Sequence, residues 1–327
     1  MKKLVPGEQT TKTSSVSKSY SYKRISIFRD IVNNPYSYLL LLPAMLYSFI
    51  YGYCTLPYMI IAFQKFNYKE GILHSKWAGL DNFKFFFNSP DAVSVTFNTI
   101  KLNFLFLTFT TLIALTIAIL LNEVTNKAFK KITQSTMIFP YFLSWIIVSY
   151  VAYSFFNSNY GVVNNMLKAI GIQQQNWYSM PQIWTLLLVL LRVWREAGNT
   201  IVIYMAAITG IDESLNEAAT IDGANRWQRI KSITLPLLMP TACILGLLAV
   251  GRIFYGDFGM IYAIIGDNGT LLPATDVIDT FVFRALRKIG DPSWAMAVGM
   301  YQSLLGFIFI FFSNMLIRRK FQDGALF

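Results

Sequence analysis

The polar stretch EAATIDGANRWQRIKSITLP, residues 217–236, interrupts a chain that is otherwise unusually apolar. Good helix formers precede Gly223, and a glycine can adopt the positive φ at which a helix often stops. Asp212 is suited to be the N-cap of this helix, because its carboxylate can accept hydrogen bonds from the first turn. The pattern therefore predicts a short helix that ends at Gly223.

A second, amphipathic helix is predicted directly after this turn, in the sequence ANRWQRIKSITL. Its apolar side chains recur on related faces, as Trp227, Ile230 and Ile233 or Thr234. Pro236 and Pro240 predict a change of direction into the apolar chain that follows. The stretch therefore reads as a helix-turn-helix of about 210–238.

The composition predicts a membrane protein. Of 327 residues, 54% are hydrophobic and only 14% are charged, whereas soluble domains carry about 25% charged residues. The net charge of +11 has no basic domain to carry it, so it indicates topology-determining lysines and arginines and not nucleic-acid binding. A single histidine and two separated cysteines give no metal-ligand cluster, and we expect no metal site.

Six apolar stretches are each close to the length that spans a bilayer. They are about 39–63, 102–121, 136–156, 183–208, 239–265 and 294–317. With the N-terminus inside, the cytosolic segments hold 16 lysines and arginines and the outer segments hold 8, which places both termini in the cytosol. The expected fold is an all-α, polytopic membrane protein of six transmembrane helices with the helix-turn-helix between spans four and five, facing the cytosol.

The segments outside the spans have different compositions. Residues 1–35 are polar and basic and predict a flexible cytosolic tail, which leaves 36–327 as the membrane domain. The outer segments 65–93, 157–180 and 265–293 mix aromatic and polar residues, and we expect short interfacial helices there, one of them starting near Thr275 or Asp276. These segments either receive a partner from outside or only connect the spans.

Ionisable residues inside the fourth and fifth stretches are candidates for a solute path, since charges at membrane depth usually face a wet cavity or a protein interior. Arg192 and Glu196 are four residues apart and could pair. Aromatic faces beside arginine, carboxylate and amide groups suit a sugar, and the excess of arginine could favour an anionic one. The alternative is a salt-bridge network that joins the two spans. The candidates are Arg192, Arg195, Glu196, Asn199, Tyr204, Arg252, Tyr255, Asp257 and Tyr262.

The motif Glu217-Ala218-Ala219, then Gly223, then Ile233-x-Leu235-Pro236 resembles the EAA motif of ABC-importer permeases in every fixed position and spacing. The stretches SKWAGLDNFKFFF, DVIDTFVFR and GDPSWAMAVGMYQSLLGFIFIFFSN resemble the carbohydrate-uptake permeases, nearest to the LplB-like oligosaccharide permeases. The resemblance covers about 36–327 and implies a bacterial, multi-pass cell-membrane subunit of a sugar importer that works by alternating access.

The resemblance also implies the partners. The loop 210–238 would be the coupling helix that docks into a cytosolic ATPase subunit, through Glu217, Ala218, Ala219, Asp222, Gly223, Ile233, Leu235 and Pro236. The chain has no GxxxxGK[ST] phosphate loop, so it is expected to be a transport subunit that binds no cofactor, while two copies of a separate ATPase use ATP-Mg. A second, different permease and an extracytoplasmic solute-binding protein complete the importer.

Two alternatives remain open. The same importer architecture could carry a non-sugar solute. An ion-coupled secondary transporter would need carboxylates or broken helices within the spans, often with internal repeats, and the sequence offers few membrane carboxylates. A membrane-embedded enzyme is not expected, because the single histidine has neither a nucleophile nor a metal cluster beside it.

Overall fold

The computed structural model describes residues 27–320. The chain divides into two compact units, Met1–Pro57 and Tyr58–Phe327. The first unit contains α1 (Ile27–Asn33), α2 (Pro35–Ser48) and the π-helical η1 (Phe49–Tyr53). The predicted flexible tail 1–35 is thus helical from Ile27, where Asp30 accepts a hydrogen bond from Asn34, while residues 1–26 lie outside the described residues.

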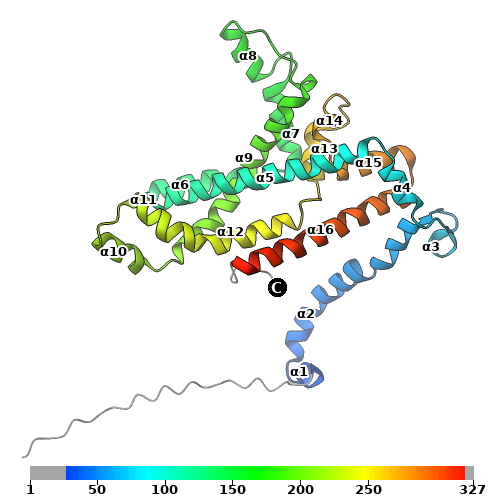
Figure 1. Ribbon diagram of the computed structural model, residues 1–327, viewed down its shortest axis with the longest axis horizontal. Helices are drawn as coiled ribbons and strands as arrows, with labels where there is room; N and C mark the ends of the chain where they lie inside the picture. The colour runs from blue at the N-terminus through cyan, green and yellow to red at the C-terminus, as the bar shows by residue number, and fades with distance from the viewer. Residues whose placement is uncertain (1–26, 321–327) are drawn as a thin grey trace, which may run out of the picture. The chain divides into compact units, whose positions relative to one another are not determined.

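The second unit is built almost entirely from helices (Figure 1). Its elements are η2 (Leu56–Phe63), β1 (Gln64–Lys65), α3 (Gly71–His74), β2 (Lys76–Trp77), α4 (Asp81–Phe87), α5 (Asp91–Asn122), α6 (Lys127–Ile138), η3 (Phe139–Phe142), α7 (Trp145–Phe156), α8 (Val162–Ala169), η4 (Trp177–Ser179), α9 (Pro181–Thr209), α10 (Glu213–Ile221), α11 (Arg226–Arg229), η5 (Ile230–Thr234), α12 (Leu235–Val250), α13 (Phe258–Ile265), α14 (Leu272–Thr275), α15 (Ile278–Ile289) and α16 (Pro292–Lys320).

The core of this unit lies between α5 and α9, which pack along each other. Small residues allow the helices to approach closely, as they do in membrane proteins. Ala114 and Ala118 of α5 are fully buried in this core. On α9, a Cβ at Gly198 would collide with the backbone carbonyl of Met137. The contact between α9 and α6 therefore requires a glycine at this position.

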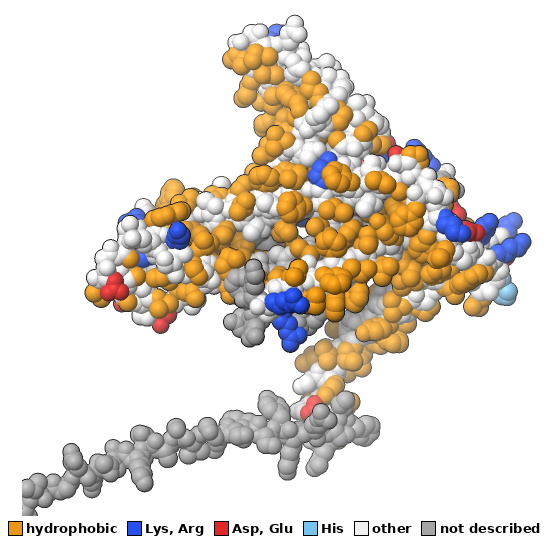
Figure 2. All heavy atoms as spheres, viewed as in Figure 1, with side chains coloured by type: hydrophobic (Ala, Val, Ile, Leu, Met, Phe, Trp, Pro, Cys, Tyr) orange, Lys and Arg blue, Asp and Glu red, His pale blue; other side chains and the backbone are white. Residues whose placement is uncertain are grey.

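Within residues 27–320, four helical segments are long and apolar enough to cross a membrane, namely 35–63, 91–122, 226–250 and 292–319, and a bent pair, 127–142 with 145–156, adds a fifth if the pair is one span. The fourth predicted span falls within α9, a continuous helix of 29 residues that carries Arg192, Arg195 and Glu196. Six spans therefore remain a prediction. Figure 2 shows hydrophobic side chains over the face that carries α5, α12 and α16, as a bilayer-facing surface requires.

The fifth predicted span, 239–265, is not one continuous helix. Its helix begins earlier, because α11, η5 and α12 form one helical segment from Arg226 to Val250, and it ends earlier, because residues 251–257 are non-helical before α13. Pro236 does not turn the chain as expected. The preceding turn widens into the π-helical η5, where the Leu235 amide bonds the Ile230 carbonyl five residues back, and so accommodates a proline without breaking the helix.

The third predicted span, 136–156, is also divided. Its two parts meet at an angle of 99°. Pro140 lies in the 3₁₀ segment η3, after which Leu143 and Ser144 are extended. The Ser144 hydroxyl accepts a hydrogen bond from the Ile147 amide and so starts α7 as a new helix.

The polar segments lie at opposite ends of the long helices. Figure 1 shows α10 and α11 at one end and α4 and α15 at the other, as expected if 210–238 and 65–93 lie on opposite sides of a membrane. The predicted short helices of 65–93 are α3 and α4, and an unexpected antiparallel pair of two-residue strands, β1 and β2, flanks α3. In 265–293, α15 begins two residues after Asp276, close to the predicted start.

Candidate functional site

The non-helical segment 251–257 is held by side chains from three other helices. The Asn103 Nδ2 donates to the carbonyls of both Ile253 and Tyr255, at 3.0 Å each. The Gln302 Nε2 donates to the Phe254 carbonyl at 3.0 Å. These partners bond backbone groups that a continuous helix would bond internally, so the helix can be interrupted here. Residues 251–257 are called the open segment below.

The amide of Gly256 in the same segment donates to the Asp279 carboxylate of α15, which also accepts a hydrogen bond from Gln302. A side chain at Gly256 would collide with Val277 and Asp279. The segment 251–257 is thus fixed on both sides, by α5 and by α15 with α16.

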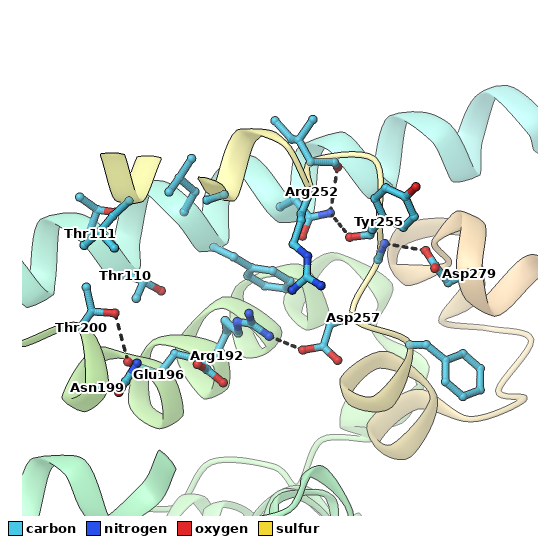
Figure 3. A pocket seen from close by; sticks show the side chains of 18 of the residues that line it. Thr110, Thr111, Arg192, Glu196, Asn199, Thr200, Arg252, Tyr255, Asp257 and Asp279 are labelled. Atoms are coloured by element: carbon cyan, nitrogen blue, oxygen red, sulfur yellow. Dashed lines mark hydrogen bonds and ion pairs between the residues drawn. The ribbon is translucent and has the colours of Figure 1, made fainter. Parts of the chain in front are cut away.

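A cavity of about 740 Å³ opens beside this segment, between it, α5 and α9. Figure 3 shows the polar side chains that converge on it from these three sides. The lining residues are Asn103, Phe106, Leu107, Thr110, Thr111, Arg192, Glu196, Asn199, Thr200, Ile203, Leu245, Ala249, Arg252, Ile253, Tyr255, Gly256, Asp257, Phe258 and Asp279. This volume is within the range of small-molecule binding sites.

Two ion pairs involve charged residues of α9, and one of them joins α9 to another element. Arg192 pairs with Asp257, which is also the N-cap of α13 and accepts a hydrogen bond from the Met260 amide at 3.0 Å. Arg195 pairs with its neighbour Glu196. The predicted pair of Arg192 with Glu196 is therefore wrong: the broken fifth stretch brings Asp257 to Arg192, and Glu196 is occupied by Arg195.

Six of the nine predicted residues line the cavity and three do not. The Arg195 guanidinium turns away, donating to the Leu143 carbonyl at 2.8 Å and lying 4.4 Å from the centre of the Trp145 ring. Tyr204 is fully buried in the core. Tyr262 packs against Phe258 and accepts a hydrogen bond from Arg287. The six that line it are Arg192, Glu196, Asn199, Arg252, Tyr255 and Asp257.

Among the described residues, the Arg252 guanidinium makes no ion pair or hydrogen bond, and Figure 3 shows it reaching from the open segment into the cavity. The Asn199 amide also lines the cavity. The Tyr255 hydroxyl is 2.8 Å from Ser303 Oγ, which fixes its ring at the cavity wall. The arrangement offers free donors beside aromatic rings, a combination that binds hydroxyl-rich solutes.

Five polar lining residues were not predicted: Asn103, Thr110, Thr111, Thr200 and Asp279. Thr110 and Thr111 lie seven and eight residues after Asn103 on α5. The three residues therefore form a polar stripe on one helix face, which the sequence already contains. Asp279 lies on an outer segment, and its place in the cavity depends on the fold. With three carboxylates and two arginines in the lining, the arginine excess suggested by the sequence is absent from the cavity wall.

The segment 210–238 forms the predicted first helix and turn. The Asp212 carboxylate accepts a hydrogen bond from the Ser214 amide at 3.0 Å, which lowers the pKa of Asp212 below its ordinary value. Gly223 ends α10 with φ of +81°. Asn225 and Gln228 then form an unpredicted capping box that starts α11. Glu217, Ala218, Asp222 and Gly223 are exposed, as are the apolar side chains of Leu215, Ile221 and Trp227.

Residues 107–322, which contain the segment 210–238 and all of the cavity lining except Asn103 and Phe106, match the family of binding-protein-dependent transport system inner membrane components. Protein LplB of Bacillus subtilis (strain 168) is 32% identical over 302 residues, 92% of this chain and 94% of LplB. The polygalacturonan/rhamnogalacturonan transport system permease protein YteP of the same organism is 32% identical over the same shares of the two chains.

Solved structures resemble the fold. A chain of a bacterial ABC transporter involved in the import of the acidic polysaccharide alginate matches with a TM-score of 0.82 and 30% identity, over 90% of this chain and 99% of that one. A chain of a bacterial alginate ABC transporter in complex with an alginate pentasaccharide-bound periplasmic protein matches with a TM-score of 0.81 and 30% identity.

Proposed function

We propose that this chain, which belongs to the family of binding-protein-dependent transport system inner membrane components, is a permease subunit of an ATP-driven importer for oligosaccharides. The observation that carries the proposal is the cavity between α5, α9 and the open segment 251–257. It combines free amide and guanidinium donors with aromatic rings in the part of the chain that the family defines.

The chemistry of the lining supports a saccharide cargo. The hydroxyls of Thr110, Thr111 and Thr200 and the amide of Asn199 can exchange hydrogen bonds with sugar hydroxyls. Tyr255 and Phe258 supply ring faces for the apolar side of a pyranose. The relative named for polygalacturonan/rhamnogalacturonan transport and the solved transporter involved in alginate import support the same class. A non-sugar solute in the same architecture is the alternative.

The surface of α10 and α11 supports coupling to a separate ATPase. The apolar side chains of Leu215 and Ile221 on α10 and of Trp227 on α11 are exposed, and a protein groove would bury them. In the proposed mechanism two ATPase copies bind ATP-Mg in the cytosol, close, and move this segment. The α11 part of this surface is continuous with α12 through the π-helical η5, so its movement would reach residues 251–257 and the cavity.

The remaining partners follow from the importer class. A second, different permease subunit would complete the path, and an extracytoplasmic solute-binding protein would deliver the oligosaccharide. An ion-coupled mechanism is the alternative in which Glu196, Asp257 and Asp279 would carry protons, since carboxylates in a cavity are the groups that such transporters use.

The test is ATP hydrolysis and uptake by the full importer complex in liposomes. Binding protein loaded with neutral or acidic oligosaccharides should stimulate hydrolysis, and uptake should need ATP and no ion gradient. Replacing Glu217 by Ala should uncouple hydrolysis from uptake with the complex intact, while Glu213→Ala on the same helix is the control. Uptake that follows a proton gradient without an ATPase would overturn the proposal in favour of the ion-coupled alternative.

A further inference from the structure

A second cavity, of about 780 Å³, lies at the end of the unit that carries α4 and α15. It is separated from the first by α15. Asp279 lines the first cavity, whereas Phe281, Arg284 and Lys288, spaced three and four residues apart, share the face that lines the second. The wall opposite α15 comes from the α4–α5 turn and from the start of α16.

Two hydrogen-bond donors in this wall have no partner. Arg284 and Trp294 are 8% and 4% exposed, and neither the Nη1 of Arg284 nor the Nε1 of Trp294 donates to any group of the described residues. The Nη2 of Arg284 bonds Asp276, whose other oxygen accepts from the Thr280 hydroxyl. Because a buried donor without an acceptor is costly, the cavity is suited to a ligand that brings oxygen atoms.

The aromatic residues of the wall form one group around Trp294. Its ring centre lies 5.7 Å from that of Phe85 and 5.4 Å from that of Phe281, in edge-to-face contacts. Phe85 is 57% exposed, so an apolar ring face is open at the cavity. A flat ligand with C–H groups on one side can cover this face.

The charges of the wall balance. Arg284 and Lys288 oppose Asp91 and Asp276, so the carboxylates offset the attraction that the cations would exert on a phosphate or another dense anion. The carboxylates and the hydroxyls of Ser89 and Ser94 add acceptors beside the donors. Balanced donors and acceptors around an aromatic face fit a hydroxyl-rich ring.

We propose that the cavity between α4, α15 and the start of α16 is a second saccharide site, which binds a pyranose unit on Phe85 with its oxygens toward Arg284 and Trp294. The choice of saccharide rests on the proposed function, and the side of the membrane follows from the predicted topology, which places this end outside. The site would hold one unit of the oligosaccharide before it reaches the cavity beyond α15.

The test measures saccharide binding to the full importer complex in nanodiscs, without ATP or binding protein, so that transport is not needed for a signal. The probes are maltotriose, trigalacturonate and an alginate trisaccharide, followed by saturation-transfer NMR. Phe85→Ala should weaken binding at this site about tenfold, the effect of losing one aromatic contact. Phe87→Ala is the matched control, since Phe87 is 55% exposed but does not line the cavity.

Trp294→Phe, which removes the donor and keeps an aromatic ring, should weaken the same binding. If the Phe85→Ala and Trp294→Phe variants bind every probe as tightly as the wild-type complex does, the inference is overturned. So does binding at this site of inorganic phosphate or of phosphatidylglycerol in place of all three probes. Saccharide binding that depends on Phe85 in a complex that fails to import would uphold this site and refute the proposed function alone.

Discussion

The pair of Arg192 and Asp257 allows the two explanations of the intramembrane charges to be separated. One explanation is a solute path, and the other is a salt bridge that only joins α9 to α13. We consider Arg192→Gln, Asp257→Asn and the double variant. Asparagine at position 257 keeps an oxygen that can accept from the Met260 amide, so the N-cap of α13 is preserved while the charge is removed.

The expected magnitude follows from burial. The side chains of Arg192 and Asp257 are 27% and 25% exposed. Removing one partner of a fully buried pair costs about 3–5 kcal/mol, since the other charge is left uncompensated. Partial exposure screens the remaining charge, and we expect each single variant to lose about 1–3 kcal/mol of unfolding free energy. The double variant should recover most of this loss, because no unpaired charge remains.

The assay combines thermal unfolding of the complex in nanodiscs with uptake in liposomes. If the pair lines the solute path, the double variant regains stability but not uptake. If the pair is only structural, both are regained. The control pair is Lys84 with Asp81, at 70% and 61% exposure, where charge removal should cost less than about 1 kcal/mol. Single variants as stable as the wild type would refute the reasoning from burial.

Three further predictions concern the elements that support the site. Gly198→Ala should separate α9 from α6 and reduce the yield of folded complex, measured by size-exclusion chromatography, because its Cβ meets a backbone carbonyl. Gly223→Val should lower the unfolding free energy by about 1–2 kcal/mol, because valine is strained at the positive φ of this position, and should reduce uptake per ATP hydrolysed. The control Gly246→Ala, in a helix with open space around it, should change neither quantity. Asn103→Leu removes two hydrogen bonds from residues 251–257, each worth about 0.6 kcal/mol in a membrane. It should therefore lower both the unfolding temperature and the uptake rate. The control Phe104→Leu, on the exposed face of α5, should lower neither.

The features that the sequence predicts correctly are those set by neighbouring residues. The cap at Asp212, the stop at Gly223 and the start of α15 near Asp276 depend on a few residues of local chain. Ionisable residues in an apolar stretch also stand out by composition alone, and of the three predicted on α9, Arg192 and Glu196 line the cavity whereas Arg195 does not.

The features that it misses depend on distant partners. Residues 251–257 read as part of a span, because their composition continues that of α12, and the helix is interrupted by partners more than a hundred residues before it and some fifty after it, Asn103 and Gln302. The bend at Leu143 is hidden in the sequence because the partner of the Leu143 carbonyl, Arg195, is 52 residues away. Pro236 gives the opposite error: a strong local signal for a turn is overridden when η5 widens to accept it.

The two interruptions explain why α9 carries charges at all. Both are contacted by a single turn of this helix: Arg195 donates to the carbonyl of Leu143 in the first, and Arg192 binds Asp257 in the second. Trp145 lies between the two guanidinium groups, with ring-centre distances of 5.8 Å to Arg192 and 4.4 Å to Arg195. Of these two arginines, Arg192 also lines the cavity, so for this residue a structural role and a solute-binding role do not exclude each other. Arg252 has no partner in the described part of the chain, and it is therefore the cavity arginine whose replacement should change solute affinity with least effect on the fold.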